Sequence, residues 1–447
     1  MTVIEDRPEP ASQEAEAAYE RFVWRNLPRN FAGHFMHGML GMTGFRLFNA
    51  PTFLPAYLHL LSGSDFVVGL GQSLQQLGGV VSPVIGATQI EHRKRVLPVA
   101  MLMGTLMRVQ ILGVALAGFF LHGAAALVTI LIFLFLLGLF SGPQSVAFQL
   151  LLAKVIPIVR RGRLQALRNV TGGAIAAGLA WFAGRYLIQG HVLGNGYSTT
   201  FLLAFVLTSL GLTALRLLMR EPEPPTVRPK GRLMDRVREF PALLHQDRSF
   251  AYFMLAQTLA TAGRVAAPFY ILFAGRSMEL SGKNLGYVSL AFLGADTITN
   301  MGWGLAGDRF GFRSTFIVSL LVWIAATVLL MVAPMTAAFA TPGGLVVGVH
   351  GLIFAAFFGL GAAQSGFLMS SQTMVLEFGA REDMAMRLAL TSTAQGTMST
   401  IGPLAGGIIA SSLGYEVLFG ASIAFLVVAL AVLLARVDEP RFRRDIA

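Results

Sequence analysis

Residues 304–314 read GLAGDRFGFRS, a loop of glycines and charged residues directly after a long apolar run. The ends of this loop have counterparts 218 positions earlier, since Gly86 corresponds to Gly304 and Arg95 to Arg313. Two such matches in a chain of 447 residues indicate that one half repeats the other with almost no insertion.

The internal repeat extends beyond this loop. Arg46 and Arg264, each near the middle of an apolar stretch, are also 218 positions apart. Further matches, at an offset of 220, are Gln144-Ser145 with Gln364-Ser365 and Arg161 with Arg381. A duplicated membrane chain that keeps a cation at the same buried place in both halves is most simply a transporter with a central site.

The composition indicates an α-helical integral membrane protein. Hydrophobic residues make up 55% of the chain and charged residues 13%, and the mean hydropathy is +0.65. A soluble domain averages about 25% charged residues. The apolar runs are too long for a β-barrel, which shows short alternating segments instead.

A membrane-spanning helix needs about 20 mainly apolar residues. On that basis the sequence predicts twelve spans, at residues 31–59, 66–89, 96–120, 124–153, 166–188, 198–219, 250–275, 285–305, 314–335, 343–373, 386–412 and 415–436. The predicted domains are an N-terminal tail (1–29), a six-helix bundle (30–219), a linker (220–249), a second six-helix bundle (250–436) and a C-terminal tail (437–447). Within the linker, residues 233–244 have the spacing of an amphipathic helix that lies on the membrane surface.

The net charge of +11 is a signal of topology. Most lysines and arginines fall in the two tails and in alternate loops, which the positive-inside rule places in the cytoplasm. We therefore expect both termini on the cytoplasmic side of an inner (plasma) membrane, and no nucleic-acid partner.

No enzyme chemistry is evident in the sequence. There are no cysteines, no glycine-rich phosphate loop before a Lys-Ser/Thr pair, and no Ser-His-Asp set on a common face. His34 and His37, three residues apart without carboxylates, make a poor metal site. We expect neither a cofactor nor a metal.

The loop after the eighth span resembles the hallmark loop of the major facilitator superfamily, Gly-x-x-x-Asp-Arg-x-Gly-x-Arg. The matching residues are Gly304, Asp308, Arg309, Gly311 and Arg313. The resemblance implies two pseudo-symmetric bundles, and a cytoplasmic latch in which Glu377 and Arg381 supply the partner charges. The first-half copy keeps Gly86 and Arg95 but has Ile90 in place of the acid, which implies a less firmly latched first half.

Four charged residues lie near the middle of predicted spans: Arg46, Arg108, Arg264 and Asp296. A charge at bilayer depth costs from ~2.5 to more than ~10 kcal/mol, and it marks a functional site by default. Arginine keeps its proton, so three cations against one carboxylate require an anion, or water in an open cavity, to complete the site.

Helical spacing adds polar neighbours to these charges. The residues predicted to line the substrate site with the arginines are Asn49, Gln144, Gln257, Asn300 and Gln364. The glutamines could equally hold helices together. His37 lies about 180° from Arg46 around a helix with 100° per residue, so we do not expect the two to share a site.

The paired arginines resemble those of the organophosphate:phosphate antiporters, which carry one arginine on the first helix and one on the seventh. In the superfamily these helices face each other across the central cavity. The resemblance therefore implies that Arg46 and Arg264 converge on a phosphate, sulfate or carboxylate. Alternatively, each arginine caps helix carbonyls or pairs internally, for instance Arg264 with Asp296. Third helices are peripheral in the superfamily, so Arg108 is expected to lie away from this site.

Three functions are open at this point. The first is secondary active transport of a small anion by a monomer, through antiport or proton coupling. The second is proton-driven efflux of hydrophobic compounds, with Asp296 as the proton-coupling residue. The third is a scaffold with the same fold that assembles other proteins or handles membrane lipid. Asp296 could also form only a structural salt bridge.

Overall fold

The computed structural model describes residues 10–90, 93–223, 247–335, 344–378 and 384–439, and the described residues form helices and no strand. The α-helices of the first half are α1 (Pro10–Phe48), α2 (Phe53–Ser62), α3 (Asp65–Ile90), α4 (Leu97–Phe120), α5 (Gly123–Val155), α6 (Ile158–Phe182) with a π-helical turn (Ala183–Ile188), and α7 (Gly196–Leu218). Those of the second half are α10 (Arg248–Gly263), α11 (Tyr270–Ala274), α12 (Gly282–Phe310), α13 (Phe312–Val332), α14 (Gly344–Glu377), α15 (Met384–Leu413) and α16 (Tyr415–Arg436).

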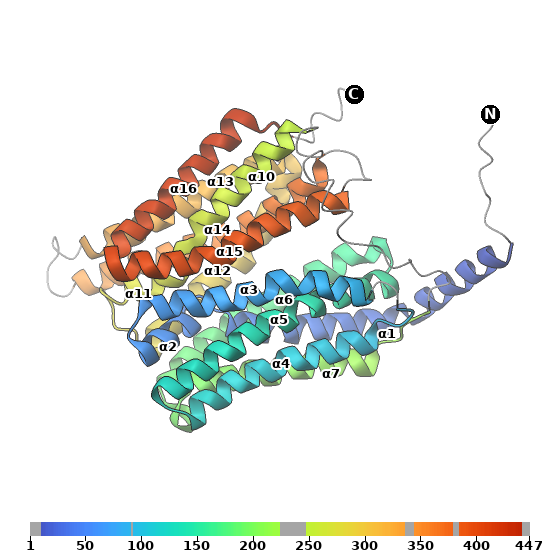
Figure 1. Cartoon of the computed structure of the whole chain (residues 1–447), viewed down its shortest axis with the longest axis horizontal. Coiled ribbons are helices and arrows are strands. Elements are labelled where there is room, and N and C mark those ends of the chain that lie inside the picture. The colour runs from blue at the N-terminus through green and yellow to red at the C-terminus, as the bar shows by residue number, and fades with distance from the viewer. Residues whose placement is uncertain (1–9, 91–92, 224–246, 336–343, 379–383, 440–447) are drawn as a thin grey trace.

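The helices form two bundles that lie side by side (Figure 1). In the first bundle α3 packs on α5 and α1 on α7, and in the second α12 packs on α14 and α10 on α16. The bundles meet along two helix pairs, α3 with α15 and α6 with α12. In the internal repeat α12 corresponds to α3, and α15 corresponds to α6. A pseudo-two-fold axis between the bundles therefore turns the pair α3 with α15 into the pair α12 with α6. The fold is therefore the predicted all-α membrane fold with two pseudo-symmetric bundles.

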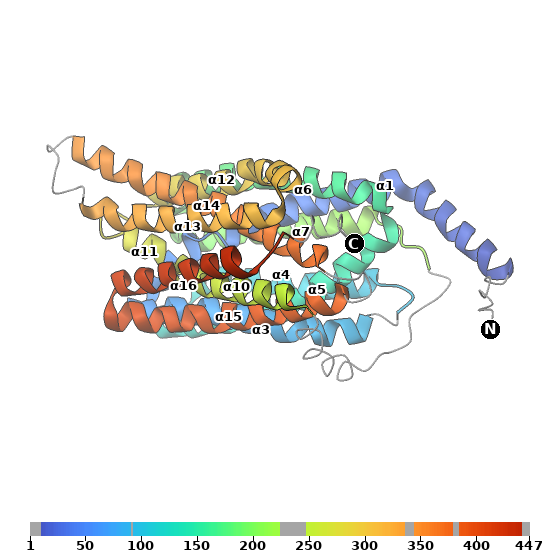
Figure 2. The same ribbon diagram turned by 90° about the horizontal axis from the view of Figure 1, so that it is seen from above.

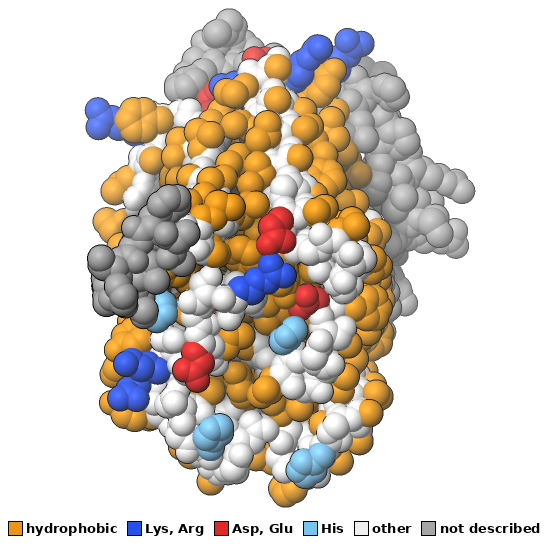
Figure 3. All heavy atoms as spheres, turned by 90° about the vertical axis from the view of Figure 1, so that its left-hand side faces the viewer, with side chains coloured by type: hydrophobic (Ala, Val, Ile, Leu, Met, Phe, Trp, Pro, Cys, Tyr) orange, Lys and Arg blue, Asp and Glu red, His pale blue; other side chains and the backbone are white. Residues whose placement is uncertain are grey.

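The start of α1 and the end of α16 lie at the same end of the bundles, which we call the tail end, and Figure 2 shows α1 projecting beyond the bundle there. The helix α1 runs without interruption from Pro10, so residues 10–29 of the predicted tail continue the first span. The short helices α2 and α11 lie at the opposite end, whose surface in Figure 3 has only scattered charges among apolar and other atoms. The predicted surface helix at 233–244 is outside the described residues.

The first and seventh spans are each broken near an arginine. The helix α1 ends two residues after Arg46, and Pro51 precedes α2. In the second half Arg264 opens a six-residue 3-10 turn that contains Pro268 and leads to α11. Proline lacks an N–H donor and disrupts a helix, so each break follows from the sequence. Each arginine is thereby placed at a helix C-terminus, where free carbonyls favour a cation.

By length and hydropathy alone, six of the described helices could cross a membrane: Leu97–Phe120, Gly123–Val155, Gly196–Leu218, Phe312–Met335, Gly348–Glu377 and Tyr415–Arg436. The helices that carry Arg46, Arg168 and Asp296 are not in this set, whereas α4, which carries Arg108, is. The charged residues therefore lie on both apolar and more polar helices.

Two carboxylates at the tail end of the bundles accept hydrogen bonds from backbone N–H groups at the starts of helices. Glu221, just after α7, accepts hydrogen bonds from the backbone N–H groups of Val96 (2.7 Å) and Leu97 (2.8 Å) at the start of α4. Glu439, just after α16, accepts one from the backbone N–H of Arg313 (3.1 Å) near the start of α13. These glutamates are also 218 positions apart, so they extend the internal repeat to the helix caps.

We expect Glu221→Gln to lower the free energy of unfolding by about 2–3 kcal/mol, because hydrogen bonds to a charged group are worth about 1.5–3 kcal/mol each. The Glu221 side chain is 4% exposed and also pairs with Lys154 at 3.1 Å. The matched control is Glu223→Gln, since Glu223 is 51% exposed in its pair with Arg95 and should change stability by less than about 1 kcal/mol. Denaturant unfolding of the detergent-purified protein measures both, and equal losses would contradict the capping role.

Candidate substrate site

Arg46 connects the two bundles. Its Nη1 atom lies 3.2 Å from Oδ2 of Asp296 and 3.3 Å from Oγ1 of Thr297, both on α12. To reach them the side chain passes over Gly173 of α6, where an added Cβ would lie 2.6 Å from Nη1. The partner of Asp296 is therefore Arg46. The alternative pairing of Asp296 with Arg264 is not the one observed.

Arg264 is held within the second bundle by neutral groups. Its Nη2 donates to Oε1 of Gln364 (2.8 Å), and its guanidinium lies 4.5 Å from the ring centre of Phe367 and 5.4 Å from that of Trp323. Its Nε has no hydrogen-bond partner among the described residues. An arginine that only capped helix carbonyls would be expected to use its Nε–H as well. Here the Nε–H of Arg264 is available to another group.

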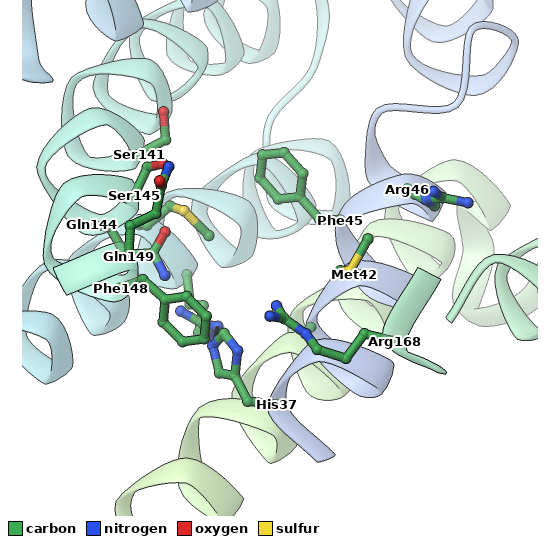
Figure 4. A pocket seen from close by; sticks show the side chains of 13 residues that line it. His37, Met42, Phe45, Arg46, Ser141, Gln144, Ser145, Phe148, Gln149 and Arg168 are labelled. Carbon is green, nitrogen blue, oxygen red and sulfur yellow. Dashed lines mark hydrogen bonds between the residues drawn. The ribbon is translucent and has the colours of Figure 1, made fainter. Parts of the chain in front are cut away.

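The two arginines line different cavities. Arg264 borders a cavity of about 100 Å³ together with Gln72 and Gln76 of α3. Arg46 borders a larger cavity of about 510 Å³ inside the first bundle, shown in Figure 4. The implied convergence of both arginines on one anion is therefore absent from this conformation.

The larger cavity holds residues that the sequence analysis placed elsewhere. Its lining consists of His37, Gly41, Met42, Phe45, Arg46, Met107, Arg108, Ser141, Gln144, Ser145, Phe148, Gln149 and Arg168. His37 thus shares a cavity with Arg46, contrary to the estimate from helical angles. Arg108 also lines it, although its helix was expected to be peripheral.

Arg108 is tied to the helices around it. Its Nε donates to the carbonyl of Thr208 and its Nη1 to that of Gly104, both at 2.7 Å. Its Nη2 lies 3.3 Å from Nε2 of His37. Each of its three nitrogens has a partner, so Arg108 is held in place on several sides and brings positive charge to the cavity.

Arg168 of α6 was missed, because it lies only a few residues inside its predicted span. Figure 4 shows it reaching across the cavity towards His37 and Phe148, whereas Arg46 points away from them. The signal that could have found it is the pair Gly172-Gly173 one turn further along α6. Small residues there allow α6 to approach its neighbours and turn this face inward.

The remaining predicted polar residues are dispersed. Asn49 accepts a hydrogen bond from Gln75 of α3 (2.9 Å), and Asn300 donates to Ser365 of α14 (3.0 Å). Gln257 is buried, and its Oε1 has no hydrogen-bond partner among the described residues. Of the amides predicted to bind substrate, Gln144 is the one that lines the larger cavity with Arg46.

Comparison with known proteins agrees with this architecture. Residues 250–446 match the family model for the Major Facilitator Superfamily. Among solved structures, a mutant of the nucleoside transporter NupG has a TM-score of 0.68 at 14% identity, over 91% of this chain and 100% of its own. The second half of the chain thus matches the major facilitator superfamily, and the whole chain shares the fold of a solved transporter.

Two further solved structures share the fold of this transporter. A D-xylose-proton symporter has a TM-score of 0.63 at 14% identity, covering 93% of this chain and 98% of its own. An inward-facing bacterial homologue of the iron transporter ferroportin has a TM-score of 0.64 at 15% identity, covering 91% of this chain and 98% of its own. No curated protein sequence matches the chain. The match over residues 250–446 and the shared fold indicate a multi-pass membrane transporter rather than an enzyme.

The residues of the predicted latch lie at the tail end of the transporter. Gly304, Asp308 and Arg309 occupy the last turns of α12, and Gly311 lies between α12 and α13. Arg313 donates to the carbonyls of Leu433 (3.0 Å) and Leu434 (3.3 Å) at the end of α16. This loop therefore fastens α13 to α16.

The remaining latch positions are also at the tail end. Glu377 is the last residue of α14, whereas Arg381 is outside the described residues. In the first half, Gly86 lies in α3, and Arg95 pairs with Glu223 at 2.8 Å. A latch formed by these residues remains a prediction.

Proposed function

We propose that this transporter carries an anion across the inner membrane by alternating access, with the larger cavity as its binding site. The observation that carries the proposal is the charge of that cavity. Arg46, Arg108 and Arg168 all line it, and in the described part of the chain Asp296 is the only carboxylate that forms an ion pair with any of them. Guanidinium groups stay charged at any working pH, so a bound anion neutralises the excess.

Arg46 is the residue through which binding is communicated between the bundles. Its partners Asp296 and Thr297 belong to the second bundle, and Arg46 itself borders the cavity of the first. An anion that binds Arg46 competes with Asp296 for the same guanidinium. Release of Asp296 loosens the contact between α1 and α12, and the freed carboxylate can then take up the coupling proton.

The orientation follows from the tails. We expect the basic tails and loops in the cytoplasm. The cavity extends from Arg46 towards the tail end, because His37 precedes Arg46 on α1 and Arg168 precedes Gly173, which Arg46 crosses, on α6. The conformation described is then the one that loads or releases substrate on the cytoplasmic side. We assign Arg264 with Gln364, Gln257 and Asn300 to the opposite wall, to be met by the substrate in another conformation.

One observation favours a second candidate, the efflux of hydrophobic compounds. Met42, Phe45, Met107 and Phe148 give the cavity apolar walls. Several of the large buried phenylalanines, however, pack on other aromatic rings within the second bundle, as Phe253 does on Phe316. The apolar surface of the cavity is thus limited, and it accompanies the arginines rather than replacing them.

A thermal-shift screen of the purified protein tests this proposal. Small organic and inorganic anions should raise the unfolding temperature, because a ligand that binds only the folded state stabilises it by mass action. Arg46→Gln should remove that shift. Arg276→Gln is the matched control, since Arg276 also forms an ion pair, at 2.8 Å with Glu416, but is 50% exposed and outside the cavity. Stabilisation by lipophilic cations alone would contradict anion transport.

A further inference from the structure

The larger cavity has two chemically distinct parts. Met42, Phe45 and Met107 supply apolar surface, whereas the fourth apolar side chain, Phe148, lies against His37 and Arg168. Towards the tail end, His37, Arg108, Arg168 and Gln149 bring donors and positive charge. The volume of about 510 Å³ is in the range of pockets for drug-sized organic ligands, about 300–1,000 Å³. An inorganic ion would leave most of that space, and all of the apolar surface, without a partner.

Arg168 is buried and incompletely paired. It is 7% exposed, and its Nε has no hydrogen-bond partner among the described residues. Its Nη1 makes one long contact of 3.4 Å with Gln165, and its guanidinium lies 5.3 Å from the ring centre of Phe148. A buried cation with an unused donor costs free energy unless a ligand completes it. Arg108, with every nitrogen engaged, does not have this deficit.

His37 offers a second unused donor beside it. An arginine can only donate, so the contact of Arg108 Nη2 with His37 Nε2 makes that nitrogen the acceptor. The proton of the neutral ring is then on Nδ1, which is buried and has no partner in the part of the chain that the structure describes. The ring itself is stacked on Phe148 at 4.3 Å between centres, which fixes its direction.

The position of Arg168 depends on a glycine of the neighbouring helix. The side chain lies along Gly38 of α1, where an added Cβ would be 1.7 Å from Nε and 2.5 Å from Cδ. No side chain can stand there unless Arg168 moves. The absence of a Cβ at residue 38 therefore leaves the guanidinium where Figure 4 shows it, pointed at His37 and Phe148.

We propose that the substrate is an amphipathic organic anion. Its carboxylate or phosphate binds Arg168 and the Nδ1–H of His37, and its apolar body lies against Met42, Phe45 and Met107. This inference rests on the proposed anion transport and adds the substrate class and the residue that selects it. Arg46 then contacts the bound substrate from the side of the cavity opposite Arg168.

The test measures binding of three probes to the full-length purified protein: 2-naphthoate, its neutral isostere 2-naphthamide, and inorganic phosphate. We expect 2-naphthoate to bind best. Arg168→Gln should weaken it about tenfold to a hundredfold, the loss of one charge-assisted contact, while Arg168→Lys should retain part of the affinity. Gly38→Ala should weaken it similarly by displacing Arg168. The matched control Gly178→Ala, where a Cβ on α6 meets nothing within 4 Å, should not.

The outcomes separate this inference from the function on which it rests. If phosphate binds as tightly as 2-naphthoate, or if Arg168→Gln has no effect while Arg46→Gln abolishes binding, the amphipathic substrate class is wrong and anion transport stands. If the amide binds as well as the carboxylate and Arg46→Gln changes nothing, both are wrong. Should Arg168→Gln fail to fold, Gly38→Ala still tests the role of Arg168, since it moves the guanidinium and leaves the charge in place.

Discussion

Asp296→Asn is expected to abolish accumulation of substrate against a gradient while leaving exchange of substrate across the membrane intact. Asn cannot take up a proton, so binding of the anion at Arg46 is no longer linked to protonation of its partner. The amide can still accept a hydrogen bond from Arg46 at the position of Oδ2, 3.2 Å from Nη1. The contact between the bundles therefore survives in a weaker form, with a neutral acceptor beside the Arg46 cation.

Proteoliposomes with an imposed pH gradient measure this, with the anion that gives the largest thermal shift as the transported probe. The matched control is Glu416→Gln, which makes the same change of carboxylate to amide in an ion pair whose glutamate is 60% exposed. Accumulation by Asp296→Asn at the rate of the unmodified protein would contradict proton coupling. If instead the variant loses stability and exchange together, Asp296 is a structural partner of Arg46, since unpairing a buried charge costs about 3–5 kcal/mol.

The fold could be predicted from the sequence because its signals are local. Runs of about 20 apolar residues mark the spans, and Pro51 and Pro268 mark the breaks in the first and seventh. The internal repeat then pairs the halves. The capping roles of Glu221 and Glu439 could not be predicted, because the sequence around a carboxylate in a polar loop does not show which distant N–H groups donate to it.

The candidate site was predicted only in part. The position of a charged residue within a predicted span does not show which residue it pairs with. Arg46 and Asp296 stood out as charges at mid-span, but their pairing depends on how α1 and α12 meet. Arg168 was overlooked because proximity to a span end is the usual sign of an exposed arginine. Here the missing side chain at Gly38 lets α1 and α6 enclose it.

His37 and Arg46 were expected not to share a site, but both line the larger cavity, for a related reason. The helical angle of about 180° assumes that a cavity touches one face of a helix. The larger cavity instead extends around α1, past Gly41, so that His37 and Arg46 both border it. Gly41 has no side chain to separate the two faces of α1, so residues on both faces reach the same cavity.

Gly173→Ala is expected to reduce transport by more than about tenfold, because it places a methyl group where the bundles meet. An added Cβ would lie 2.2 Å from Oγ1 of Thr297 and 2.6 Å from Nη1 of Arg46. The arginine can swing aside, but threonine is branched at Cβ and has few rotamers to escape into. The helices α6 and α12 must therefore separate, and Arg46 loses its contact with Asp296.

Two measurements check this against Gly178→Ala, which adds the same methyl group to the same helix in open space. Transport in proteoliposomes should be near that of the unmodified protein for Gly178→Ala only. The chain has no cysteine, so Val159→Cys on α6 and Phe310→Cys on α12, both exposed, give a unique pair of sites for spin labels. Gly173→Ala should shift the distance distribution between them. An unchanged distribution with unchanged transport would mean that the crossing of Arg46 over Gly173 is not the contact through which the bundles are coupled.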